Sequence, residues 1–244
     1  MNPKVVIQAG GKGSRLYPYT KVLPKPLMPV GGLPILEIVI RQLAASGFHD
    51  LVITIGHLGD MIRWCCGDGS KWGVHIEYVA EDQPRGTMGP LRQVKGLTQP
   101  FLVMNGDLLT DLDFGQFFHS HLASKAPLSI ATYMKAVNIS LGVLETDASD
   151  RVIGFREKPT LHFPCSMGVY GMNPDLLRLI PENQPFGFDS LMQRLLDLGI
   201  KARSVLFDGT WMDIGRPEDF QLACEVFEKR PDLFLPRHEL RQAG

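Results

Sequence analysis

Short apolar runs alternate with segments of helical periodicity through the first half of the chain, and this alternation limits the folds open to it. The apolar runs lie at 4–9, 51–55, 74–79 and 101–104, and the helical segments at 34–46, 58–66 and 86–95. Parallel strands joined by crossover helices produce this pattern, because the helices cover both faces of the sheet. The sequence therefore predicts an α/β fold with a mostly parallel central sheet.

The second half mixes strand and helix patterns without a long linker or repeat. Strands are expected at 128–134, 141–145, 152–155, 168–172 and 202–207, and helices at 174–180, 189–198 and after Pro217. With 244 residues, 44% hydrophobic, the chain can bury a sizeable core. We expect one domain over residues 1–230, followed by a loose polar tail at 231–244.

Charge and cysteine usage narrow the classes of partner. A formal net charge of -1 does not favour nucleic acid or an anionic membrane as partner. The four cysteines lack CxxC spacing and no apolar run has membrane-spanning length, so we expect a reduced, cytoplasmic protein. Residues 1–36 nevertheless hold five Lys or Arg and no Asp or Glu, which suits an anionic ligand.

A glycine-rich turn, Gly10-Gly11-Lys12-Gly13-Ser14-Arg15, follows the first expected strand directly. Glycines let the backbone approach a phosphate and present its N–H groups, and the two cations add charge there. The spacing is not that of a Walker A loop, and the third glycine of a dinucleotide-binding fingerprint is missing. On this turn alone, an ordinary tight turn and an anion site remain equally good interpretations.

The continuation decides between them. Lys25 stands between Pro24 and Pro26, so a stiff backbone delivers its ammonium to one place. The run from Gly10 to Pro34 resembles the signature of the sugar-1-phosphate nucleotidyltransferases, in which a glycine-rich loop ending in arginine precedes a PKP segment. This resemblance implies a Rossmann-like three-layer sandwich of the GT-A-like nucleotidyltransferase type, with residues 1–230 as its catalytic domain.

Later segments match the same family in the same order. Residues 86–91 resemble its GTAGAL turn, residues 105–107 its metal-holding GD step, residues 157–159 its EKP motif and residues 211–215 its WxDIG step. The resemblance implies an NTP and a sugar 1-phosphate as substrates, Mg²⁺ as cofactor, and Arg15, Lys25 and Lys158 as catalytic residues. It implies nucleotide binding by Ala9, Gly10, Gly11, Gly13, Ser14, Arg15, Glu81, Gly86 and Thr87, sugar-phosphate binding by Gly142, Glu157, Lys158 and Ser166, and metal binding by Asp107 and Asp213.

The two aspartates also make chemical sense. Transfer at an α-phosphorus requires a hard cation with oxygen ligands to offset charge on the phosphates. Asp107 and Asp213 are 106 positions apart, yet each follows an expected strand, so both can reach one edge of the sheet. Either carboxylate alone would more simply be a helix cap or turn residue.

Departures from the family pattern leave the substrates open. Gln8 stands where an apolar residue usually precedes the glycine turn, and Ser166 replaces an asparagine that would face the sugar. Overall similarity to short GTP-using members favours GTP, with UTP, CTP or dTTP as alternatives. A homo-oligomer is compatible with the sequence. The competing classes are a dinucleotide-dependent oxidoreductase, against which the missing glycine argues, and a non-catalytic nucleotide-binding protein of the same fold.

Overall fold

The computed structural model describes residues 3–236 and has a seven-stranded sheet at its centre. The strands run in the order β12-β8-β11-β6-β1-β4-β5. Their bounds are β12 Arg203–Phe207, β8 Leu128–Asn138, β11 Thr160–Met172, β6 Phe101–Asn105, β1 Lys4–Ala9, β4 Asp50–Ile55 and β5 His75–Ala80. Only β11 runs antiparallel to its neighbours, so the predicted mostly parallel mixed sheet is confirmed.

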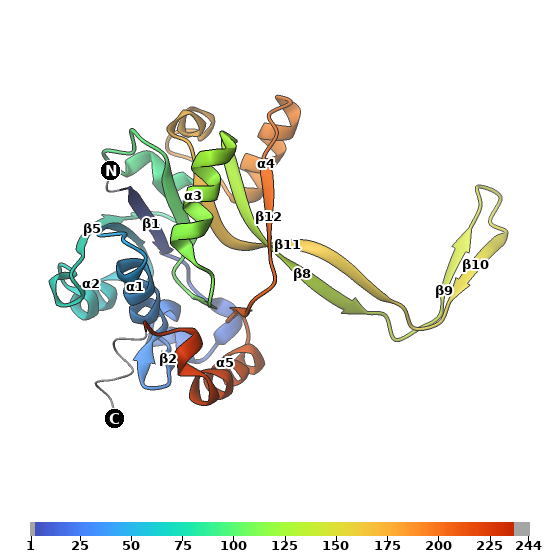
Figure 1. Ribbon diagram of the computed structural model, residues 1–244, viewed down its shortest axis with the longest axis horizontal. Coiled ribbons are helices and arrows are strands. Elements are labelled where there is room, and N and C mark those ends of the chain that lie inside the picture. Colours follow the sequence, from blue (N-terminus) through green and yellow to red (C-terminus); the bar gives the residue numbers. More distant parts are fainter. Residues whose placement is uncertain (1–2, 237–244) are drawn as a thin grey trace.

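Helices cover the sheet on both faces (Figure 1), and the side chains of β1 show why. Val5 and Ile7 pack under α1 (Ile35–Ala45), α2 (Gly59–Cys66) and α3 (Phe114–Ser124). Val6 points to the other face, where α4 (Phe188–Asp197) and two 3-10 segments cover it. All three β1 side chains are fully buried, and the predicted three-layer arrangement follows from this period of two.

A third apolar cluster packs the C-terminal helix of the described chain against the first helix. α5 (Pro217–Lys229) packs through Ala223 and Phe227 on Ile35 and Ile38, which lie on the side of α1 away from the sheet. Phe234 is buried and its ring stacks on Phe227, with centroids 5.8 Å apart. The predicted loose tail is therefore wrong for 231–235, where apolar residues dock on α5, and residues 237–244 lie outside the described part.

Short elements connect this framework. The small strands are β2 (Pro29–Val30), β3 (Leu33–Pro34), β7 (Leu108–Thr110), β9 (Val143–Thr146), β10 (Val152–Arg156) and β13 (Trp211–Asp213). The 3-10 segments are Ser14–Leu16, Tyr19–Lys21, Lys25–Leu27, Ser70–Trp72, Gly89–Gln93, Pro174–Leu179 and Pro231–Leu233. The helices expected at 86–95 and 174–180 are thus shorter 3-10 segments. Pro90 would fall inside an α-helix over 86–95 and lacks the N–H that its interior needs, so the segment is limited to Gly89–Gln93.

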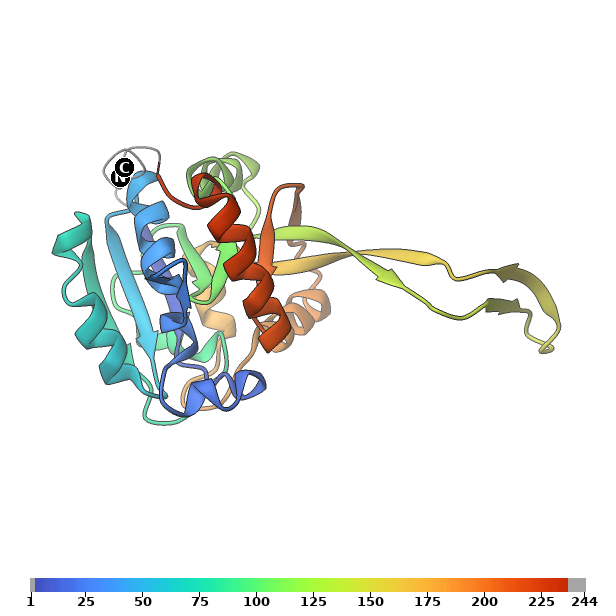
Figure 2. The same cartoon turned by 90° about the horizontal axis from the view of Figure 1, so that it is seen from below.

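The largest departure from the sequence prediction is a long two-stranded arm, residues 134–166 (Figures 1 and 2). β8 and β11 pair continuously from Ser166↔Thr132 out to Thr160↔Asn138, and the β9–β10 hairpin forms the tip. In both views the arm extends away from the body of the protein. Strands expected at 128–134 and 168–172 are therefore only the inner ends of much longer strands.

Within residues 3–236, none of the helices combines the length and apolar character needed to span a lipid bilayer.

Candidate active site

Contacts with Thr20 and His57 fix the conformation of the glycine turn after β1. Gly13 adopts a left-handed conformation with φ of 61°, and a Cβ there would lie 2.9 Å from the side chain of Thr20. The buried Thr20 hydroxyl donates a hydrogen bond of 3.0 Å to the Gly13 carbonyl. A ring nitrogen of His57 lies 3.0 Å from the Thr20 carbonyl oxygen and braces the same segment. The turn therefore presents its backbone in one fixed shape.

A second loop, residues 81–90, faces the glycine turn. Gly86 has φ of 72°, and a Cβ there would lie 2.8 Å from the Phe186 carbonyl oxygen, so only glycine fits. Met88 N and Gly89 N donate to that same oxygen at 2.9 and 3.0 Å. The hydroxyl of Thr87 accepts a 2.9 Å bond from the backbone N–H that begins α4. These bonds fix the loop to the neighbouring layer.

The two loops enclose a cavity of about 410 Å³ at the carboxyl ends of the parallel strands, the usual place for a ligand in such a sheet. Its lining residues are Gln8, Ala9, Gly10, Gly11, Gly13, Ser14, Arg15, Lys25, Pro26, Thr54, Glu81, Pro84, Gly86, Thr87, Pro90, Asn105, Asp107 and Gly215. Every residue predicted to bind nucleotide is among them. Asn105 and Thr54 were not predicted, although their positions at the ends of β6 and β4 could have indicated them.

Lys25 and two aspartates form the electrostatic centre of the cavity. The buried Lys25 Nζ lies 2.5 Å from Asp107 Oδ2 and 3.6 Å from Asp213 Oδ1. The aspartates meet because β13 pairs with β7, placing Asp213 opposite Leu108, the residue after Asp107. Two carboxylates thus lie close to the same ammonium group. Carboxylate oxygens are hard donors of the kind that bind Mg²⁺.

Arg15 lies on the other side of this centre. A Cβ on Gly215 would be 3.1 Å from the Arg15 guanidinium, so this glycine lets the side chain pass closely over the strand that carries Asp213. Arg15 itself is exposed and lines the cavity. Its guanidinium can therefore reach an anion in the cavity without being freed from a buried ion pair.

Glu81 and Gln8 supply polar groups deeper in the cavity. Glu81 Oε2 accepts a 3.0 Å hydrogen bond from the Arg85 backbone N–H, yet burial raises the pKa of this carboxyl. Gln8 Nε2 donates to the Thr87 carbonyl, and Gln8 Oε1 is buried without a hydrogen-bond partner among the described residues. A carboxylate and an amide therefore stand close to both cavity loops, as expected where a nucleobase is recognised.

The residues predicted to bind the sugar phosphate do not line the cavity. Gly142, Glu157 and Lys158 lie on the arm, and Ser166 lies at its base. Glu157 and Lys158 are exposed, with 3.8 Å between Oε1 and Nζ, and Glu157 Oε2 would be 3.3 Å from a Cβ on Gly142. These three form one cluster. The structure brings the nucleotide and metal residues together but leaves the sugar-side cluster on the arm.

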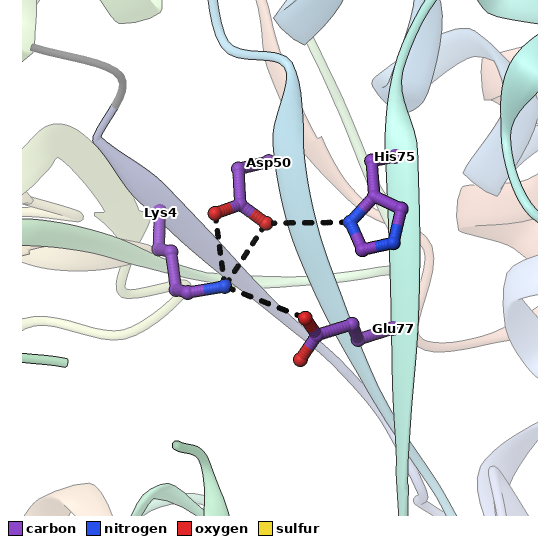
Figure 3. A network of polar contacts seen from close by, with 4 residues as sticks. All are labelled: Lys4, Asp50, His75 and Glu77. Carbon is purple, nitrogen blue, oxygen red and sulfur yellow. Dashed lines mark hydrogen bonds and ion pairs between the residues drawn. The ribbon is translucent and has the colours of Figure 1, made fainter. Parts of the chain in front are cut away.

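A second group of possible metal ligands lies at the amino ends of β4 and β5 (Figure 3). Asp50, His75 and Glu77 place their ligand atoms within 4.8 Å of one another at the start of β4 and β5. Lys4 Nζ already lies 2.9 Å from Asp50 Oδ2 and 3.8 Å from Glu77 Oε1. None of these side chains lines the cavity beside the glycine turn, so we interpret the group as an ion-pair network across three strands.

Comparison with known proteins places this arrangement in a family. The nucleotidyl transferase family pattern matches residues 4–230. The chain belongs to the nucleotidyl transferase family. Mannose-1-phosphate guanylyltransferase of Mycobacterium tuberculosis is 31% identical to this chain over 223 residues. The match covers 88% of this chain and 62% of that protein. UTP–glucose-1-phosphate uridylyltransferase of Synechocystis is 30% identical over 260 residues, 98% of this chain and 67% of that protein.

Solved structures agree with the family assignment. The crystal structure of HddC from Yersinia pseudotuberculosis superposes with a TM-score of 0.72 at 25% identity, covering 92% of this chain and 99% of that one. The predicted GT-A-like α/β fold and the predicted family are therefore confirmed. This family member spans only 62% of the mycobacterial enzyme's length, so its own substrates are a matter for proposal.

Proposed function

We propose that this chain transfers a nucleoside monophosphate from an NTP to a sugar 1-phosphate and releases pyrophosphate. The observation that carries the proposal is the convergence of Asp107 and Asp213 on Lys25, at a cavity that Lys25, Asp107 and the glycine turn line. A phosphate-binding backbone, a cation site and free guanidinium charge at one point suit phosphoryl chemistry. The sugar-phosphate enzymes among the relatives support the same reaction class.

Positioning and charge are the means of catalysis that this site offers. Asp107 and Asp213 would hold Mg²⁺, which, when bound, offsets charge on the phosphate oxygens. The turn N–H groups and Arg15 bind the triphosphate, and Lys25 lies beside the α-phosphate. The sugar phosphate oxygen forms a bond to the α-phosphorus while the bond to the β-phosphate oxygen breaks, so pyrophosphate leaves with its electron pair. No covalent enzyme intermediate is required.

GTP is the nucleotide that we favour. Its base would present two adjacent N–H donors, N1–H and N2–H, to the Glu81 carboxylate and the unpartnered Gln8 Oε1. Mannose-1-phosphate guanylyltransferases recur among the relatives, and HddC was also crystallised with GMP-PN. The uridylyltransferase relative keeps UTP as the alternative. We further propose a cytoplasmic location, with no nucleic-acid or membrane partner, consistent with the free cysteines and the net charge of -1.

One assay tests this function. The protein is incubated with Mg²⁺, each NTP in turn and a panel of sugar 1-phosphates, and pyrophosphate is measured. We expect release with GTP and one or a few sugar phosphates, and none when EDTA replaces Mg²⁺. Release with UTP alone would correct the nucleotide, whereas nucleotide binding without pyrophosphate from any pair would make the chain a non-catalytic binding protein.

A further inference from the structure

The arm, residues 134–166, lacks the packing that its composition requires. None of its residues is buried, and it exposes eight large apolar side chains on both of its faces. They are Met134, Val137, Leu141, Leu144, Val152, Ile153, Phe155 and Phe163, with exposed fractions from 40% to 72%. A two-stranded ribbon is at best marginally stable in water, and clustered apolar side chains of this kind mark interaction surfaces.

The arm also has two bare strand edges. β12 pairs with β8 only as far as Tyr133, and β6 pairs with β11 only from Val169 onward. Residues 134–138 and 160–164 are therefore paired only with each other, and their outer backbone groups have no strand partner among the described residues. Edges of this kind are templates for pairing with another chain.

The charge pattern of the arm indicates what that chain is. The arm has four basic and four acidic side chains, so it is neutral overall. They are Lys135, Arg151, Arg156 and Lys158, and Glu145, Asp147, Asp150 and Glu157. A neutral surface of mixed charge and apolar groups is complementary to itself, and two identical edges pair antiparallel about a two-fold axis. These features fit a second copy of this chain better than a strongly charged or membrane partner.

The cavity lacks groups for the sugar phosphate among the described residues. Its lining comes from residues 8–107 and Gly215, and it includes none of the predicted sugar-phosphate residues Gly142, Glu157, Lys158 and Ser166. An acceptor phosphate needs a cation, and Lys25 is already paired with Asp107. Lys158 is exposed where the ribbon meets the β9–β10 hairpin. Its φ is 43°, a left-handed conformation that non-glycine residues adopt at a cost and that concentrates at functional sites.

We propose that two copies exchange arms, so that the arm of each packs on the other and carries Glu157 and Lys158 to the partner's cavity. The β8–β11 ladder spans residues 132–138 without a break, so the arm is one continuous ribbon that extends away from its own body (Figures 1 and 2). At about 3.3 Å per residue, the ribbon outside the sheet extends roughly 20 Å before the hairpin tip adds to its reach. Delivery to the partner's site rests on the proposed function, whereas the exchange itself does not.

Molecular mass tests the exchange without reference to activity. Sedimentation of the full chain should give a two-fold multiple of the 27.1 kDa protomer. Val137→Asp and Ile153→Asp place a charge on the exposed apolar surface and should each give a folded monomer. Leu196→Asp is the matched control, because Leu196 is equally exposed but lies on α4, and it should stay dimeric. A monomeric wild-type protein, or arm variants that remain dimers, would overturn the proposal.

Complementation between two inactive variants tests whether the arm carries Lys158 to the partner's cavity. Asp107→Asn has a defective cavity and an intact arm, whereas Lys158→Ala has an intact cavity and a defective arm. Each variant is assayed alone, and the two are assayed together after co-expression. With exchanged arms, half of the random dimers are mixed and each contains one fully intact site, so about one quarter of wild-type activity should return. A co-expressed pair that is no more active than its members would overturn delivery to the partner's site. An inactive wild-type dimer would instead refute the proposed function and leave the exchange standing.

Discussion

Replacing Asp107 by Asn separates catalysis from folding. The change keeps the side-chain shape but removes the carboxylate 2.5 Å from the Lys25 ammonium. Removing one partner of a fully buried pair costs about 3–5 kcal/mol, since it leaves a buried charge uncompensated. Here Asp213 remains 3.6 Å from the same ammonium and Asp107 is 22% exposed, so we expect a smaller loss of about 1–2 kcal/mol. The melting temperature should fall by about 2–8 °C.

Activity should fall far more than stability. Losing one preorganised charge at a reacting phosphate lowers kcat by about 10²–10³, or about 2.7–4 kcal/mol. Pyrophosphate release at saturating substrate measures kcat, and differential scanning calorimetry measures the unfolding transition. Asp111→Asn is the control, because its Oδ1 accepts from Thr210 N at 2.6 Å and asparagine preserves that acceptor. If Asp107→Asn keeps activity within about threefold of wild type, the assigned role is wrong.

Two further predictions test the framework. Gly86→Ala should lower the free energy of unfolding by about 2 kcal/mol and weaken nucleotide binding, because a Cβ would meet the Phe186 carbonyl. Gly47→Ala is the control: Gly47 also has a positive φ, but a Cβ there meets open space, so chemical denaturation should show a loss of only about 1 kcal/mol. Burial lowers the pKa of His121 below its ordinary 6.5, so the unfolded chain binds the proton first. The free energy of unfolding should therefore fall as pH drops below about 6.5, level off below the folded-state pKa, and lose this slope in His121→Gln; an unchanged slope would show that another group titrates.

The nucleotide half of the site could be predicted because its signals are local in sequence. A continuous apolar run identified β1, and the glycine turn and Lys25 follow it within twenty residues, so their meeting required little knowledge of topology. What the sequence did not contain was the ammonium of Lys25 lying between the two aspartates. That geometry depends on the β7–β13 pairing across about 100 residues, which no local pattern specifies.

The arm could not be predicted for a different physical reason. Segments 134–138 and 160–166 have apolar residues on both faces and no buried side, so they lack the one-sided alternation that identifies a strand. β11 enters the arm through a register shift between Ser166 and Tyr170, at Gly168 with φ of 76°. The sequence predicts a strand only from residue 168 onward, so it does not indicate that Gly142, Glu157 and Lys158 lie on an extended arm.

The effect of Mg²⁺ on nucleotide affinity tests most directly whether Asp107 and Asp213 share a cation. Isothermal titration of the productive NTP, with and without Mg²⁺, gives a ratio of dissociation constants for wild type and for Asp213→Asn. Asp213→Asn leaves Lys25 paired with Asp107, so the protein should stay folded and bind metal-free nucleotide normally. We predict that Mg²⁺ tightens binding at least about tenfold in wild type and not in the variant. An equal Mg²⁺-dependent gain in both proteins would contradict the shared site.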